Sequence, residues 1–121
     1  MMSYIEKRID YRAELEEQAK FKILSDSEKG LSFGYESAIT KNVSKGGLCL
    51  LLPHKMETGS VLRVEVPFEN SKRTVKAFCE VQWCAPETAG RYEVGLSFIA
   101  LKEDDVEFIA SYISEKAGKV M

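Results

Sequence analysis

Alternation of apolar and polar residues in the second half of the chain predicts a series of β-strands. Between residues 62 and 68 every second side chain is apolar, and the neighbours include Arg63 and Glu65. The same pattern returns over residues 75–83 and 92–98. A period of two is typical of strands that bury one face and expose the other. The apolar positions are Leu62, Val64, Val66, Phe68, Val75, Ala77, Cys79, Val81, Trp83, Tyr92, Val94, Leu96 and Phe98.

Two groups of turn-forming residues separate these strands. Glu69–Lys72 divides the first strand from the second, and Pro86–Gly90 divides the second from the third. Short polar connections of this kind join antiparallel neighbours. The sequence therefore predicts a three-stranded meander.

Further strands are expected upstream of the meander. Phe21 and Ile23 indicate one strand, and Leu31–Ile39 indicates another. Leu48–Leu52 is apolar on both faces, as expected for a strand inside a barrel or under a packed helix. The chain as a whole is predicted to contain about six strands.

The period of the apolar residues changes after Leu101. Acidic residues at positions 103–105 and lysines at 116 and 119 suit the two ends of a helix dipole, and Gly118 is the expected C-terminal stop. The apolar stripe is expected to pack on the sheet, with a homodimer interface as the alternative. The stripe consists of Val106, Ile109, Ala110 and Ile113.

Composition indicates one compact domain. The 121 residues are 45% hydrophobic, which is enough for a modest core. The 17 basic residues are outnumbered by 19 acidic ones, a balance that disfavours binding of long nucleic acid. The sequence contains neither a signal-peptide core nor an apolar stretch long enough to cross a bilayer. We therefore expect a cytoplasmic protein without membrane insertion.

Cysteine and histidine usage indicates no metal site and no catalytic centre. Cys49, Cys79 and Cys84 lie in apolar stretches, where they are expected to be small buried side chains rather than disulfide partners. His54 is the only histidine. Because no motif supplies an activated nucleophile or a coupled acid and base, we expect no cofactor, no metal and no enzymatic activity.

Candidate chemistry begins with an R-x-x-x-R spacing at Arg8 and Arg12. Guanidinium groups match phosphate oxygens, or the O6/N7 edge of guanine, with two parallel hydrogen bonds. The pair therefore favours a phosphate-bearing purine.

A structural alternative explains the same arginines without a ligand. Ser3–Glu6 has the pattern of a capping box, and a helix beginning there would place Arg8 and Arg12 on one solvated face. The acidic residues at positions 14, 16 and 17 would also weaken the local positive potential.

The second candidate motif is Asn42–Gly47, between two apolar runs. Asn42 and Ser44 offer short polar groups to a base edge, and Gly47 allows close backbone approach. The alternative is an ordinary tight turn, because these residue types are common where strands reverse. Trp83 and Tyr11 suggest base stacking, but Trp83 is interpreted as a core residue, and neither is included in the site.

In order and spacing, the two motifs resemble the PilZ domain family, whose signature is R-x-x-x-R followed by [D/N]-x-S-x-x-G. The residues Val81–Trp83 and Tyr92–Phe98 are similar to later strands of that domain. The resemblance implies a mainly β fold: a six-stranded antiparallel barrel with a C-terminal helix and a short N-terminal arm. The implied division is residues 1–18 for the arm, 19–100 for the barrel and 101–118 for the helix.

The resemblance also implies a function, that of a receptor for the bacterial second messenger cyclic di-GMP. The implied ligand-binding residues are Arg8, Arg12, Asn42, Ser44 and Gly47, with the arm closing over the ligand. We expect a separate effector protein to recognise the closed arm. The alternative is a PilZ-like adaptor that binds protein partners without nucleotide.

Overall fold

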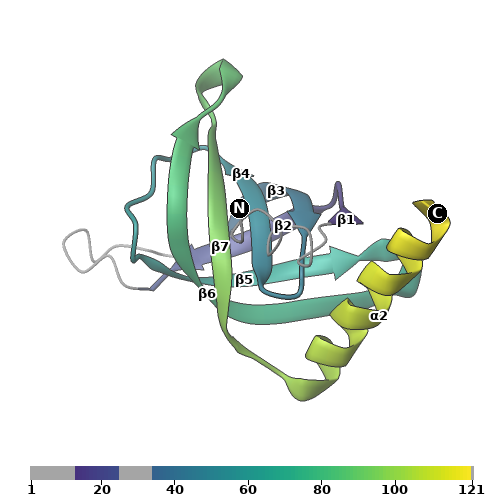
Figure 1. Ribbon diagram of the computed structural model, residues 1–121. Coiled ribbons are helices and arrows are strands. Elements are labelled where there is room, and N and C mark those ends of the chain that lie inside the picture. The colour runs from purple at the N-terminus through teal and green to yellow at the C-terminus, as the bar shows by residue number, and fades with distance from the viewer. Residues whose placement is uncertain (1–12, 25–33, 121) are drawn as a thin grey trace, which may run out of the picture.

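The computed structural model describes residues 13–24 and 34–120, and the side chains as far as residue 116. Seven strands and one long helix make up this part of the chain (Figure 1). The elements are β1 (Ala13–Glu14), β2 (Gln18–Ile23), β3 (Glu36–Val43), β4 (Gly47–Leu52), β5 (Val61–Phe68), η1 (Glu69–Ser71), β6 (Arg73–Pro86), η2 (Thr88–Gly90), β7 (Tyr92–Leu101) and α2 (Glu103–Val120).

Six of the strands, β2 to β7, form a closed antiparallel barrel. Neighbouring strands follow the order β3-β2-β5-β6-β7-β4, and the pairing of β4 with β3 closes the cylinder. The short strand β1 pairs with β3 as well, on the edge that β2 also uses. This arrangement confirms the predicted six-stranded antiparallel barrel with a C-terminal helix.

The barrel core is built by the predicted alternation. In β5 the side chains of Leu62, Val64, Val66 and Phe68 are buried, and those between them are half-exposed. In β4 the leucines at positions 48, 50 and 52 point inward. Cys49 and the half-exposed Leu51 lie on the outer face, so the apolar run of β4 contributes to both surfaces of the barrel wall.

The third strand begins later and ends later than its apolar pattern predicts. It runs from Glu36 to Val43, so Asn42 belongs to the strand rather than to the junction after it. Thr40 is fully buried in this strand, and its hydroxyl both accepts a hydrogen bond from the backbone of Glu17 and donates one to it. A polar residue satisfied in this way interrupts the apolar pattern without interrupting the strand. Residues 31–33 of the predicted strand lie outside the described residues.

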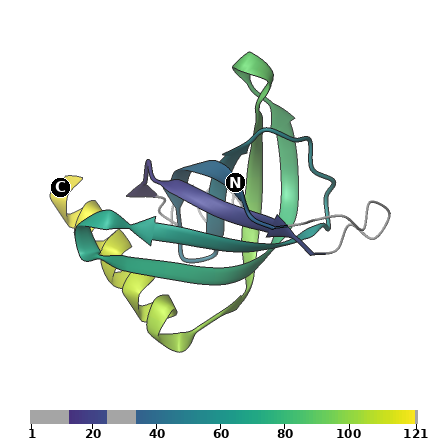
Figure 2. The same ribbon diagram turned by 180° about the vertical axis from the view of Figure 1, so that it is seen from behind.

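Helix α2 lies beside the hairpin of β5 and β6 (Figures 1 and 2). Ile109 and Ile113 are buried as predicted, but Val106 is 48% exposed and faces away from the core. The helix also continues through Gly118, which is therefore not its C-terminal stop. Within the described part of the chain, no helix has the length and the hydropathy that a membrane crossing requires.

Aromatic and charged contacts fix α2 against the barrel. The ring of Phe68 makes edge-to-face contacts with the rings of Phe108 and Tyr112, at centroid distances of 4.9 and 5.0 Å. Nε and Nη2 of Arg73 both donate to Oδ1 of Asp105, at 3.1 and 2.9 Å. The first helical turn is therefore joined to the first residue of β6.

Candidate functional site

Ser44 closes the turn between β3 and β4. Its backbone N–H donates to the carbonyl of Gly47 at 2.9 Å. Its hydroxyl accepts from the N–H of Gly46 at 3.2 Å and lies 3.5 Å from the same Gly47 carbonyl. Because the Ser44 side chain is buried and already bonded to the turn, it has a structural role in this hairpin.

Gly47 is required by the close approach of β7. A β-carbon at this position would stand 1.8 Å from the carbonyl oxygen of Leu96, which is backbone and cannot move aside. The neighbouring carbonyl of Gly46 accepts a hydrogen bond from the N–H of Phe98 at 2.8 Å. The hairpin end is therefore pressed against β7, as the absence of a side chain at residue 47 permits.

Asn42 lies on the outer face of β3, close to the turn. A β-bulge shifts the register between Thr40 and Asn42, after which Asn42 pairs with Cys49 of β4. The pairing continues across the barrel wall from Cys49 to Gly95 and from Gly95 to Trp83. These four residues form a row across β3, β4, β7 and β6, which we call the outer row.

The last residues of the predicted arm are bound to β3 beside Asn42. Glu14 pairs with Asn42, and Ala13 pairs with Val43. The N–H of Leu15 donates to the carbonyl of Lys41 at 3.0 Å. The end of the arm therefore meets the barrel next to the second motif.

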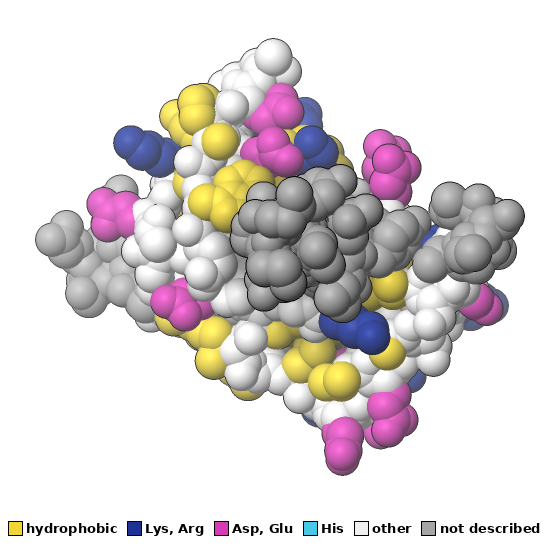
Figure 3. Space-filling view, in the orientation of Figure 1, with side chains coloured by type: hydrophobic (Ala, Val, Ile, Leu, Met, Phe, Trp, Pro, Cys, Tyr) yellow, Lys and Arg dark blue, Asp and Glu magenta, His cyan; other side chains and the backbone are white. Residues whose placement is uncertain are grey.

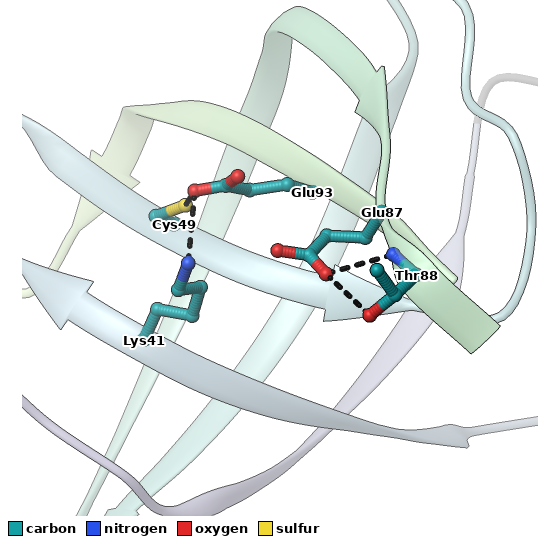
Figure 4. A network of polar contacts seen from close by, with 5 residues as sticks. All are labelled: Lys41, Cys49, Glu87, Thr88 and Glu93. Atoms are coloured by element: carbon teal, nitrogen blue, oxygen red, sulfur yellow. Dashed lines mark hydrogen bonds and ion pairs between the residues drawn. The ribbon is translucent and has the colours of Figure 1, made fainter. Parts of the chain in front are cut away.

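A network of polar contacts lies beside the outer row (Figure 4). Oε2 of Glu93 accepts from Nζ of Lys41 and from Sγ of Cys49, both at 3.3 Å. The hydrogen bond and the charge of Glu93 raise the pKa of Lys41. Nearby, Glu87 accepts from the backbone and the hydroxyl of Thr88, and these bonds lower the pKa of its carboxyl group. The positive charge of Lys41 is therefore already matched by a carboxylate.

Trp83 is not a core residue, contrary to the interpretation from its strand pattern. The register of β6 against β7 shifts between Val81 and Trp83, so that the indole lies on the outer face and is 44% exposed. A bulge adds one residue to a strand and reverses the facing of those that follow. Gly95 in the facing strand was a possible sequence signal, because a strand glycine often marks a close approach.

A shallow depression is lined mainly by residues of β2, β3 and β4. Its volume is about 210 Å³, and Arg91 is its charged member. The lining residues are Gln18, Ser37, Ala38, Ile39, Leu51, Leu52, Pro53 and Arg91. Figure 3 shows apolar and charged side chains side by side on the face of the molecule turned toward the viewer.

The structure thus places three of the five predicted site residues, Asn42, Ser44 and Gly47, in one hairpin. Arg8 and Arg12 lie outside the described residues, as do Tyr11 and the predicted capping box. Among the residues that are described, no group of His, Cys, Asp and Glu side chains could hold a metal ion. Cys79 is buried inside the barrel, and this burial raises the pKa of its thiol to about 12.

Comparison with known proteins gives one family and one fold. The family model described as PilZ domain matches residues 6–115. No curated protein matches the chain in sequence. The match covers most of the chain and includes all of the candidate site residues.

Several solved structures share the fold at low sequence identity. The PilZ domain with c-di-GMP of YcgR from Escherichia coli is 11% identical and has a TM-score of 0.66, covering 92% of each chain. The inhibitor of motility MotI/DgrA from Bacillus subtilis is 13% identical with a TM-score of 0.73. The match covers 91% of this chain and 51% of that one, so the chain spans about half the length of MotI/DgrA. A tetrameric PilZ domain from Xanthomonas campestris is 12% identical with a TM-score of 0.64, and the match covers 91% of this chain and 89% of that one.

Proposed function

This chain belongs to the PilZ domain family, and on that premise we propose that it is a cyclic di-GMP receptor in bacterial second-messenger signalling. PilZ domains are receptor or adaptor domains rather than enzymes, and they generally bind cyclic di-GMP. The proposed ligand-binding residues are Arg8, Arg12, Asn42, Ser44 and Gly47.

One observation carries the proposal: Glu14 pairs with Asn42, so the chain that follows the arginine motif is fixed to the strand that carries the second motif. Arg12 is covalently joined to Ala13, and consecutive α-carbons are about 3.8 Å apart. Arg8 is at most about 18 Å from Ala13 along an extended chain. Both guanidinium groups are therefore within reach of the outer face near Asn42.

The charges of the described face support a role for the two arginines. Cyclic di-GMP carries two phosphodiester charges. Lys41 is paired with Glu93, while Glu14 and Glu87 add further negative charge around the outer row. A dianion bound here needs compensating positive charge, which we propose Arg8 and Arg12 supply, ideally as bidentate pairs.

The remaining site residues have different proposed roles. The Asn42 amide can hydrogen-bond the edge of a guanine. Ser44 and Gly47 hold the hairpin in the conformation that presents Asn42 and the turn backbone. Trp83 is added to the predicted site, because its exposed indole at the end of the outer row offers a stacking surface for a base.

Closure of the arm would turn binding into a signal. Fixing one backbone residue costs about 1–2 kcal/mol, and a hydrogen bond to a charged group returns about 1.5–3 kcal/mol. A few arginine–phosphate bonds can therefore offset the cost of holding the arm over the ligand. We propose that a separate effector protein recognises the closed arm. We also propose that the arm, the barrel and α2 act as one domain in the cytoplasm.

A nucleotide-independent adaptor is the second candidate. The observation that favours it is that Ser44 and Gly47 each satisfy a requirement of the hairpin itself. Two of the three site residues of the second motif would therefore persist in a protein that had lost its ligand. In that case the barrel or α2 would bind protein partners directly.

Isothermal titration calorimetry with cyclic di-GMP tests the proposal, with GTP and cyclic di-AMP titrated separately as control ligands. We expect saturable, guanine-selective binding by the parent protein and none by Arg8→Ala/Arg12→Ala. Arg63→Ala is the matched control, because it removes an arginine of β5 that lies outside both motifs and away from the outer row. If the parent protein gave neither heat nor a shift of melting temperature at high ligand concentration, the adaptor would replace the receptor.

A further inference from the structure

The outer face of β2, β5 and β6 carries a concentration of positive charge. The registers place Lys20 opposite Glu65 and Glu65 opposite Lys76. In the next row, Lys22 lies opposite Arg63 and Arg63 opposite Phe78. Both rows point outward, because the alternate residues of the three strands are buried in the core. We call these six residues the basic face.

The charge of the basic face opposes that of the whole chain. Four of its six residues are cations and one is an anion, whereas the chain has a formal net charge of −2. Arg63 and Glu65 approach to 4.0 Å. Within the described part of the chain, the three lysines of the basic face form no ion pair. The face therefore has a positive potential that an acidic surface would match.

An arginine and an aromatic ring lie at one edge of the basic face. The guanidinium carbon of Arg63 lies 5.4 Å from the ring centroid of Phe78, which is 37% exposed. Phe78 pairs with Ala100, whose neighbour Ile99 is 54% exposed. Arginine and aromatic residues are enriched at the energetic centres of protein interfaces, and charges surround them at the rim. The arrangement therefore offers an anchor for one apolar side chain among charged contacts.

The same residues fit a protein better than a phosphate polymer. Glu65 stands at the centre of its row and would repel a line of phosphates, and the negative net charge of the chain adds to this repulsion. A protein segment can place a basic residue against Glu65 and acidic residues against the lysines. Because β2, β5 and β6 are internal strands of a closed barrel, such a segment would bind through side chains rather than by adding a strand.

We propose that the basic face is a docking surface for a partner protein, which presents an acidic segment with an exposed apolar side chain that packs on Phe78. The inference is independent of nucleotide binding. The face lies on β2, β5 and the first half of β6, apart from the outer row that ends at Trp83.

Fluorescence anisotropy of a labelled synthetic peptide tests this docking surface. The probe is a glutamate-rich helix-forming peptide with a leucine at every fourth position, and its partner peptide has glutamine in place of glutamate. We expect saturable binding of the acidic peptide only, weakened at least tenfold by Arg63→Gln/Lys76→Gln and by Phe78→Ser, and weakened by salt. Lys55→Gln/Lys102→Gln removes two exposed lysines outside the face and should leave the affinity unchanged.

Three results would overturn the proposal. The first is equal peptide binding by the parent protein and all variants, with Lys20→Gln/Lys22→Gln included as a second pair. The second is tighter binding of an oligothymidylate or of phosphatidylglycerol vesicles through the same residues. The third is self-association in sedimentation that the same substitutions abolish, since the face would then bind a second copy. Titration with cyclic di-GMP should be unaffected by these substitutions, which separates this test from that of the receptor.

Discussion

Trp83 lies so closely over Gly95 that a β-carbon on residue 95 would stand 2.2 Å from the indole Nε1. The two residues are paired across β6 and β7, and the indole covers the space that a side chain would occupy. Gly95 is buried for this reason although it lies on the outer face. The exposed indole is therefore fixed in position by a glycine from the neighbouring strand.

Substitution Gly95→Ala should displace the indole. We expect a loss of about 1–2 kcal/mol in the free energy of unfolding, because overpacking forces the ring to move. The chain has one tryptophan and five tyrosines, so fluorescence excited at wavelengths that tyrosine does not absorb reports on this ring alone. Emission should shift to longer wavelength as the ring becomes more exposed, and an unchanged spectrum would contradict the contact.

Gly47→Ala should be much more damaging than Gly46→Ala. The added carbon at residue 47 would meet the backbone oxygen of Leu96 at 1.8 Å, whereas nothing lies within 4 Å of the same position at Gly46. We expect a cost of about 3 kcal/mol or more for Gly47→Ala. Urea unfolding of the two variants measures the difference, and equal midpoints would show that the hairpin is not held against β7.

Thr40→Val should loosen the segment between the arm and the barrel. The Thr40 hydroxyl accepts from the Glu17 N–H at 2.9 Å and donates to the Glu17 carbonyl at 2.8 Å. Removing it leaves the Glu17 N–H without its partner, at a cost of about 1–3 kcal/mol, whereas the Glu17 carbonyl keeps its bond from the Thr40 N–H at 2.9 Å. Hydrogen exchange at Glu17 should become faster, while the exposed control Thr74→Val should leave it unchanged.

Asp105→Asn should destabilise the protein more than Asp104→Asn. Both substitutions remove a carboxylate from the first turn of α2, so their effects on the helix dipole are similar. Only Asp105 accepts two hydrogen bonds from Arg73. Since the Arg73 side chain is 37% exposed, we expect an extra cost of only about 1 kcal/mol. Equal melting temperatures of the two variants would show that this pair contributes nothing.

Alkaline pH should weaken the fold through Cys79. Burial raises the pKa of this thiol from 9.0 to about 12, so the folded protein keeps a proton that the unfolded chain loses. The contribution of this thiol to the free energy of unfolding is fully present below pH 9.0 and is lost as pH rises toward about 12. In this range the free energy of unfolding falls by up to about 1.4 kcal/mol per pH unit. Cys79→Ala should lower stability at pH 7 through lost packing, but should show a shallower decline above pH 9. Parallel curves for the two proteins would exclude this contribution.

Strand alternation predicted the barrel well, because one face of each strand packs in the core and the other meets water. The prediction failed where a local structural feature changed which face of the sheet a side chain lies on. The bulge before Trp83 moved it outward, and the bonds from Thr40 to Glu17 buried a hydroxyl inside β3. Neither feature changes the alternation of residue types within its own strand, and the possible signal for Trp83, Gly95, lies in the facing strand.

The candidate site was only partly predictable for a similar reason. The order and spacing of the motifs indicated Asn42, Ser44 and Gly47, but not that two of them would be bonded or packed within the hairpin itself. The cross-strand contacts of Lys41 and Cys49 with Glu93 join residues far apart in the chain. Such contacts depend on the register between strands, which the sequence pattern does not determine.

Asn42 and Val43 have β1 on one edge and β4 on the other, and this sharing has a mechanical consequence. A pulling force on the N-terminus would load the two residue pairs of β1 in shear, along the axis of β3. The same backbone leads directly into the turn that carries Ser44. Tension applied to the arm is therefore transmitted to the hairpin between β3 and β4. A ligand bound to both the arm and this hairpin would raise the force at which β1 detaches from β3.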